Sequence, residues 1–177
     1  MATTFVDSET PVLSPSNAAL ALVAIGILVI GYILLSMLLG IREYFAGFVF
    51  SLIWGAFYKS SFAEFPQVLA GSLLGVALCY FNYRAPLMIP HYGAPVALVV
   101  IVAAVYCMLV GRLKLFINNS TMVFLTICTV PEIQEKAGFG GIGAAVVLAA
   151  AYVGSITYIL LKVKTHTDKR RHELAVG

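Results

Sequence analysis

Amide and hydroxyl side chains cluster in one stretch of an otherwise apolar chain, residues 115–133, with the sequence LFINNSTMVFLTICTVPEI. Asn119 and Thr126 are seven positions apart and share one face of a helix, while Asn118 and Thr121 share another. Such groups can replace water around a small polar solute, so these four residues are candidates for solute binding. Two alternatives are hydrogen bonding between helices and a helix break, because Asn and Ser compete for backbone groups.

An aromatic stripe precedes this polar run in the sequence. Ser51, Trp54 and Tyr58 are spaced three to four apart and lie on one helix face. We expect Trp54 and Tyr58 to shape a solute path. The alternative is that they lie at a membrane interface or between helices, where such side chains are common.

Ionisable residues are absent from the middle of every apolar stretch and occur only at the ends. Ion-coupled carriers usually need such a group inside the bundle, so its absence favours an uncharged solute or no transport. We find no nucleophile elbow, P-loop, HExxH or CxxC pattern, and an enzyme is therefore the least supported class. The sequence also predicts no metal and no cofactor.

The composition explains where these residues must lie. Of the 177 residues, 61% are hydrophobic and 11% are charged, whereas soluble domains carry about a quarter charged residues. A small soluble fold could not bury so much apolar surface. We therefore predict an all-α, polytopic transmembrane helix bundle.

Six apolar stretches are candidate membrane helices. They cover residues 17–40, 44–58, 67–83, 94–111, 115–130 and 139–161. We expect a disordered N-terminal tail over 1–16, the bundle over 17–161 and a basic cytoplasmic tail over 162–177. The fifth stretch is short, so a re-entrant segment is the alternative to a sixth span.

The distribution of Lys and Arg favours six spans with both termini cytoplasmic. That arrangement places eight basic residues inside and three outside, against seven and four for five spans. The tail residues nearest the last span should contact anionic lipid headgroups. They are Lys162, Lys164, Lys169, Arg170 and Arg171. The same cluster needs no nucleic-acid partner to explain it.

An internal repeat is indicated at an offset of 74 residues. Val49 and Phe50 recur as Val123 and Phe124, and small residues near Gly71 recur near Ala145. Three spans per unit would make the second unit inverted relative to the first, as in many transporters and channels. The alternative is chance matching between helices rich in Ala and Gly. The small residues predicted to let helices pack closely are Gly71, Gly75, Gly141 and Ala145.

Two stretches resemble a known family. They are FAGFVFSLIWGAFYKSSFAEFPQVLAGSLLG, residues 45–75, and CMLVGRLKLFINNSTMVFLTICTV, residues 107–130. Over residues 44–161 the chain resembles bacterial inner-membrane proteins grouped as domain-of-unknown-function family ten-ninety-seven. The resemblance implies a bacterial inner membrane and a compact bundle, and it implies no substrate.

Two functional hypotheses follow. The first is a channel or facilitator for a small, uncharged solute, in a homo-oligomer. The second is an accessory or assembly subunit of a larger membrane complex, because no coupling or catalytic set is present. A coupled exporter is a weaker third, which would depend on Glu43, Lys59 or Glu64 at helix ends.

Overall fold

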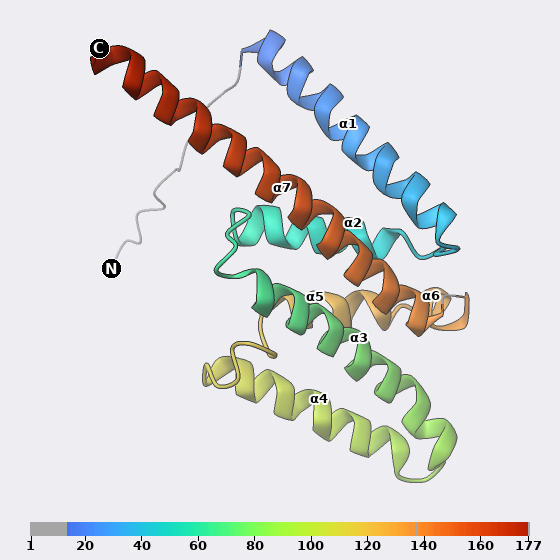
Figure 1. The fold of residues 1–177 in the computed structure, drawn as a ribbon. Helices are drawn as coiled ribbons and strands as arrows, with labels where there is room; N and C mark the ends of the chain where they lie inside the picture. The colour runs from blue at the N-terminus through green and yellow to red at the C-terminus, as the bar shows by residue number, and fades with distance from the viewer. Residues whose placement is uncertain (1–13, 137, 177) are drawn as a thin grey trace.

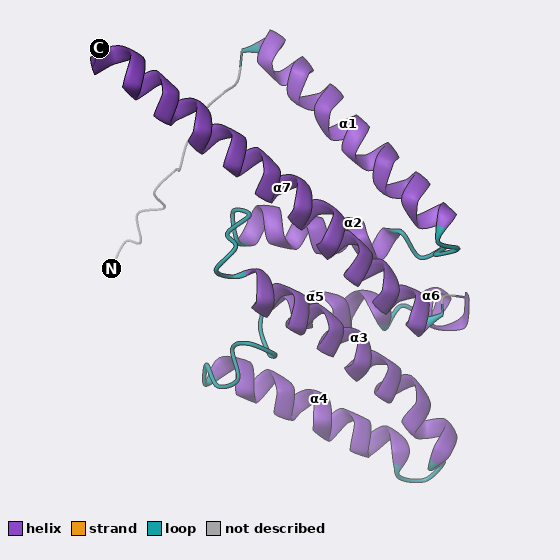
Figure 2. Ribbon diagram, in the orientation of Figure 1, coloured by secondary structure: helices purple, strands orange, loops and turns teal. Residues whose placement is uncertain are grey.

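The computed structural model describes residues 14–136 and 138–176, with side chains described as far as His166. Every regular element in these residues is helical (Figures 1 and 2). The elements are α1 (Pro15–Leu38), α2 (Phe45–Leu52), the π-helix η1 (Ile53–Phe57), α3 (Phe65–Met88), α4 (Gly93–Leu109), α5 (Asn119–Cys128), α6 (Pro131–Lys136) and α7 (Phe139–Val176). The all-α prediction is therefore confirmed for the described residues. The predicted disordered tail, 1–16, lies almost wholly outside them.

Proline marks the start of several helices. Pro15 and Pro131 are the first residues of α1 and α6, Pro66 is the second residue of α3, and Pro95 is the third of α4. The first-turn N–H groups of a helix have no intrahelical partner, so proline loses nothing there. These prolines therefore set where the helices begin.

Glycine marks the end of two helices. Gly40 and Gly111 follow the ends of α1 and α4 with φ of 71° and 69°. This left-handed conformation ends a helix by turning the chain, and glycine adopts it without steric cost. Both ends lie within two residues of the predicted ones.

Successive long segments alternate in direction. Figure 1 shows the loops around residues 39–44 and 89–92, together with α6, at the right end of the bundle, and the loops around 58–64 and 110–118 at the left end. The chain therefore traverses the bundle repeatedly. α3 and α7 run antiparallel, with Phe65 of α3 near Gly154 of α7, and Tyr80 near Phe139.

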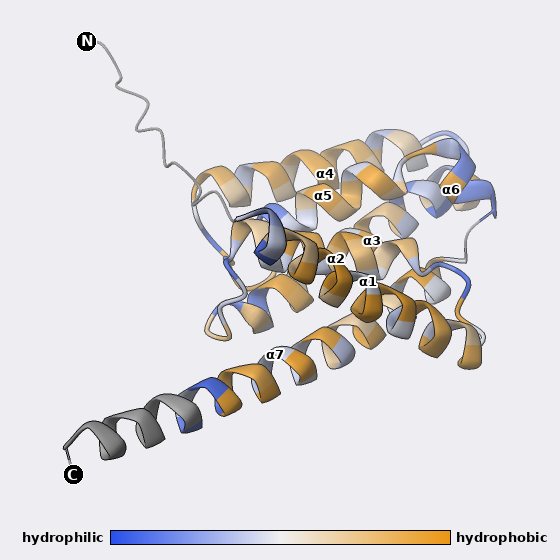
Figure 3. Ribbon diagram, turned by 90° about the horizontal axis from the view of Figure 1, so that it is seen from above, coloured by the Kyte–Doolittle hydropathy of each residue, from blue (hydrophilic) through white to orange (hydrophobic). Residues whose placement is uncertain are grey.

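Helices α2, α3, α5 and α7 enclose the core. Its fully buried side chains include Phe50, Ile53, Trp54, Val68, Phe124, Ile142 and Val146. Of the three long apolar helices, α1 is the least enclosed, and only Tyr32 and Ser36 on it are buried. Many large hydrophobic side chains are exposed on the outer surfaces of the helices. Figure 3 shows by colour that most of the helices consist of hydrophobic residues.

Among the residues that the structure describes, three helices are long and apolar enough to cross a membrane. They are Pro15–Leu38, Phe65–Met88 and the part of α7 over Phe139–His166. The segments Phe45–Phe57, Gly93–Leu109 and Asn119–Cys128 are apolar but shorter. An all-helical fold with lipid-compatible outer faces is what the composition predicted.

Several predicted boundaries are wrong. Residues 84–88 continue α3, because Pro86 lies in its last turns, where a missing N–H removes only one terminal hydrogen bond. Leu115–Ile117 lie in turns, so α5 begins at Asn119 rather than at Leu115. α7 continues beyond Leu161 to Val176, so the basic segment extends the last helix. The short helix α6 was not predicted.

Candidate functional site

Asn118 is the N-cap of α5. Its Oδ1 accepts a hydrogen bond from the N–H of Ser120 at 2.9 Å, and its Nδ2 donates to the carbonyl of Gln67, on α3, at 2.8 Å. The unpaired N–H groups at a helix start favour Asn in this position. Its amide therefore joins the start of α5 to the first turn of α3.

Thr121 completes the cap. Its Oγ1 accepts a hydrogen bond from the N–H of Asn118 at 3.2 Å and donates to the carbonyl of Phe116 at 2.6 Å. Asn118 and Thr121 thus lie together, as their spacing predicted. Both side chains already hydrogen-bond to the backbone, and the bond of Asn118 to Gln67 is also one between helices, so both alternatives to a solute site describe these two residues.

Asn119 and Thr126 lie elsewhere on α5, on its exposed surface. The Thr126 hydroxyl donates to the carbonyl of Met122 at 2.8 Å. Their shared face agrees with the seven-residue spacing, and it points away from the core. These two residues therefore do not join Asn118 and Thr121 in one polar site.

Trp54 and Tyr58 lie near the loop between η1 and α3, where several aromatic side chains pack together. Trp54 is 1% exposed, and its Nε1 donates to the carbonyl of Ser61 at 2.9 Å. Its ring packs edge-on against Phe62 and Phe65, at centroid distances of 5.4 and 5.0 Å. Tyr58 is half-buried against the core. Trp54 therefore anchors the loop between η1 and α3.

Gly71 and Gly75 lie where α3 meets α5. A Cβ on Gly71 would collide with the side chain of Asn118. A Cβ on Gly75 would lie 2.6 Å from the carbonyl oxygen of Thr121 and 2.8 Å from the Cβ of Phe124. Residues further along α3 contact residues further along α5, so the two helices run parallel. They lie so close together at Gly75 that a larger residue would not fit there.

α7 meets α2 in a corresponding way. A Cβ on Gly47 of α2 would lie 2.9 Å from the Cβ of Ala149. The carbonyl of Ala145 accepts a hydrogen bond from the Tyr32 hydroxyl at 3.1 Å, and Gly141 lies against the Glu43 carboxylate. α2 and α7 therefore also run parallel.

Glu43 stood out in the sequence only as a charged group at a helix end. Its Oε1 accepts a hydrogen bond from the N–H of Gly138 at 3.1 Å, just before α7. A carboxylate is stabilised at a helix N-terminus by the unpaired N–H groups and the helix dipole. Glu43 therefore joins the loop before α2 to the start of α7, as Asn118 joins the loop before α5 to the start of α3.

The helix starts and the buried positions recur at the predicted offset of 74. α2 and α5 start at Phe45 and Asn119, and α3 and α7 start at Phe65 and Phe139. Pairs of buried residues at this offset are Ala46 and Ser120, Gly47 and Thr121, Phe50 and Phe124, Trp54 and Cys128, Val68 and Ile142, Gly71 and Ala145, Ser72 and Val146, Gly75 and Ala149, and Val76 and Ala150. Matching positions in the two halves thus face the core.

Two contacts between the halves are also reciprocal. Gly47 lies against Ala149, and the residues 74 positions away from these two, Thr121 and Gly75, also lie against each other. Phe65 likewise lies against Gly154, and the residues 74 positions away, Phe139 and Tyr80, also pack together, with ring centroids 5.3 Å apart. These two contacts therefore have counterparts at the 74-residue offset.

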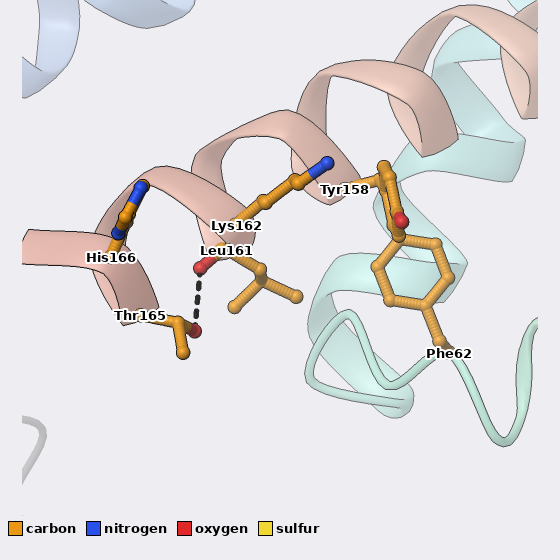
Figure 4. A pocket seen from close by; sticks show the side chains of 6 residues that line it. All are labelled: Phe62, Tyr158, Leu161, Lys162, Thr165 and His166. Carbon is orange, nitrogen blue, oxygen red and sulfur yellow. Dashed lines mark hydrogen bonds between the residues drawn. The ribbon is translucent and has the colours of Figure 1, made fainter. Parts of the chain in front are cut away.

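Hollows also occur around this core. A cavity of about 200 Å³ lies between α1, α2 and α7, and its lining includes Ile25, Tyr32, Phe48, Ser51, Tyr152 and Ile156. A larger and more open groove of about 760 Å³ lies along α7 beside the loop before α3 (Figure 4). Its lining residues are Phe62, Tyr158, Leu161, Lys162, Thr165 and His166.

The remaining predicted residues are basic. Lys162 and Lys164 are exposed on α7. The side chains of Lys169, Arg170 and Arg171 lie outside the described part. Within the described residues no group of three or more His, Cys, Asp or Glu side chains could hold a metal ion.

Comparison with known protein families, curated proteins and solved structures found no match. The resemblance to family ten-ninety-seven therefore stays a prediction, and the fold and its contacts carry the functional argument.

Proposed function

We propose that the chain is an inverted-repeat membrane protein that lets a small, uncharged solute cross the bilayer. One unit comprises α1, α2 and α3, and the other comprises α4, α5 and α7. The antiparallel directions of α3 and α7, together with the 74-residue offset in helix starts and contacts, support the inversion. Paired inverted units are the common architecture of proteins that open alternately to either side of a membrane.

The proposed orientation places both termini in the cytoplasm. Asn118 contacts Gln67 near the start of α3, so the loops with Lys59, Arg112 and Lys114 share one face with Lys162. Glu43 contacts Gly138 at the other face, together with Arg42, Arg84 and Lys136. The first face carries more basic residues and is the cytoplasmic one under the positive-inside rule. For a bacterial chain, the membrane would be the inner membrane.

Aromatic side chains at both ends of the apolar part of α7 fit a bilayer. Phe139 packs against Tyr80 and Tyr83 at one end, and Tyr158 packs against Phe62 at the other. Tyr158 lies 19 positions after Phe139, which corresponds to about 29 Å of helix, close to the thickness of the hydrocarbon core. Aromatic belts are typical of both interfaces.

The reciprocal contacts between the units are the observation that carries the proposal. Ser72 and Val146, which are 74 positions apart on α3 and α7, are fully buried, so these two positions line no open passage in this conformation. Passage would require the two units to move against each other. The absence of ionisable groups at mid-helix favours a neutral solute and a passive route.

Flux into proteoliposomes tests the proposal. Urea and glycerol serve as neutral probes, and cysteines replace Phe65 and Gly154 in a chain whose three native cysteines are changed to alanine. Joining these cysteines with a short bifunctional thiol reagent should arrest flux, and a reductant should restore it. A control pair within one helix, Gly140→Cys with Gly143→Cys, should not respond. No protein-dependent flux of either probe, or flux indifferent to the cross-link, would contradict the proposal.

An accessory or assembly subunit is the second candidate, and the weak enclosure of α1 favours it. Only Tyr32 and Ser36 of α1 are buried, and a cavity lies between this helix and the helices α2 and α7 that it contacts. A helix of this kind offers an apolar surface to another membrane protein. Purification in mild detergent separates the candidates: a stoichiometric foreign partner favours the subunit, and a homo-oligomer or a lone chain favours the facilitator.

A further inference from the structure

One face of α7 combines apolar, aromatic and basic side chains in sequence. Tyr158, Lys162 and His166 are each four residues apart, and Leu161 and Thr165 lie beside them at the same spacing. Residues four apart on a helix are neighbours, so the five form one strip. Figure 4 shows this strip, with Phe62 approaching Tyr158 from the loop before α3.

The groove has an apolar end and a basic end. The Phe62 and Tyr158 rings meet edge-on, with centroids 6.3 Å apart, and Leu161 extends their surface. Lys162 and His166 follow toward the C-terminus. The Thr165 hydroxyl donates to the Leu161 carbonyl at 2.9 Å, and none of the six lining side chains is acidic.

Its depth matches the boundary between acyl chains and headgroups. If Tyr158 lies at the edge of the hydrocarbon, Lys162 and His166 lie about 6 and 12 Å further along the helix. These are the depths at which lysine side chains reach anionic headgroups. The order of side chains along the groove is therefore the order of chemical groups in a phospholipid.

We propose that this groove is a discrete binding site for an anionic phospholipid. Lys162 pairs with the phosphate, His166 hydrogen-bonds to the headgroup, and Phe62, Tyr158 and Leu161 cover the start of an acyl chain. Charge complementarity favours this occupant, since the groove is basic and open to the lipid side. The site is more specific than general attraction to the tail, and it does not depend on whether the protein conducts a solute.

Lys162 and Lys164 form a matched pair for the test. Each carries one positive charge on the exposed part of α7, but only Lys162 lines the groove. The full chain is titrated in mild detergent with dioleoyl phosphatidylglycerol or dioleoyl phosphatidylcholine, and bound lipid is counted by native mass spectrometry. Phosphatidylglycerol should bind more tightly than phosphatidylcholine. Lys162→Gln should weaken its binding about tenfold, as expected for a charge-assisted contact, and Lys164→Gln less than twofold.

Two further titrations separate recognition of a whole lipid from binding of its charge alone. Phe62→Ala should weaken the binding of the dioleoyl lipid more than the binding of its short-chain dihexanoyl analogue, because the rings of Phe62 and Tyr158 cover the acyl chain. Equal losses for Lys162→Gln and Lys164→Gln would show general attraction and overturn the proposal. Glycerol 1-phosphate binding as tightly as the lipid, or no preference over phosphatidylcholine, would overturn it as well.

Discussion

The carboxylate of Glu43 accepts a hydrogen bond from the backbone N–H of Gly138 at 3.1 Å, across 95 positions of sequence. This contact holds the loop before α2 against the first turn of α7. Its counterpart is the contact of Asn118 with Gln67, which holds the loop before α5 against the first turn of α3. The two contacts differ in chemistry, since one uses a charge and the other an amide, but they join equivalent places.

Glu43→Ala should destabilise the protein. The substitution leaves the N–H of Gly138 without its acceptor and removes a negative charge from a helix N-terminus, which should cost about 1 kcal/mol. Thermal unfolding in detergent would show a lower midpoint. Glu132→Ala is the control, because its ion pair with Lys136 is about three-quarters exposed and contributes little. Equal losses for the two variants would contradict the assigned role.

Asn118→Ala should destabilise the protein more than Asn119→Ala. Asn118 caps α5 and also bonds to α3, so its loss should cost about 1–3 kcal/mol, whereas Asn119 is exposed. Denaturant or thermal unfolding measures both. A large loss of solute flux in Asn119→Ala without loss of stability would instead support a solute site at this residue.

Gly75→Ala should weaken the packing of α3 on α5. The added methyl would lie 2.6 Å from a backbone oxygen of Thr121, which cannot move without displacing α5, so the expected cost is about 1–3 kcal/mol. Gly143→Ala is the matched control on α7, because nothing lies within 4 Å of its Cβ position. Retention of monodisperse protein after heating would distinguish them. Equal behaviour would indicate that α3 and α5 do not pack this closely.

Tyr32→Phe should loosen α1, and Tyr106→Phe should not. Tyr106 stands 74 positions after Tyr32, but it is 65% exposed, whereas Tyr32 is 3% exposed and donates to the Ala145 carbonyl. Loss of that buried hydrogen bond should cost about 1 kcal/mol. Protease susceptibility of the segment after α1 and the unfolding midpoint would report it. Unchanged stability of the Tyr32→Phe variant would show that the Tyr32 hydrogen bond does not hold α1, which the Tyr152 hydroxyl also joins to α7 through the Leu28 carbonyl.

Sequence reasoning predicted the apolar helices because hydrophobic runs and prolines act locally. It placed the start of the last helix at Phe139, where α7 begins. It was less successful where two local signals competed. Pro86 suggested a helix end, but a proline in the last turns removes only one hydrogen bond, and α3 continues to Met88.

The polar run shows why the site was harder to predict. Asn118 and Thr121 would stand at the same positions in the sequence whether they bind a solute or cap a helix. Which one occurs depends on the carbonyls that lie nearby, and Gln67 is 51 positions away. Spacing on one helix could group the polar side chains by face, but it could not show that Asn119 and Thr126 face outward.

The amino-acid sequence alone determined the class of molecule, because a chain with 61% hydrophobic and 11% charged residues must form apolar helices whose outer faces suit lipid. It also contained the 74-residue offset. The tertiary structure decided how the halves meet: Gly75 lies against Thr121 as Gly47 lies against Ala149. It also decided that the asparagine cap is occupied by backbone groups. Such close approaches depend on where distant segments cross, and no local propensity encodes that crossing.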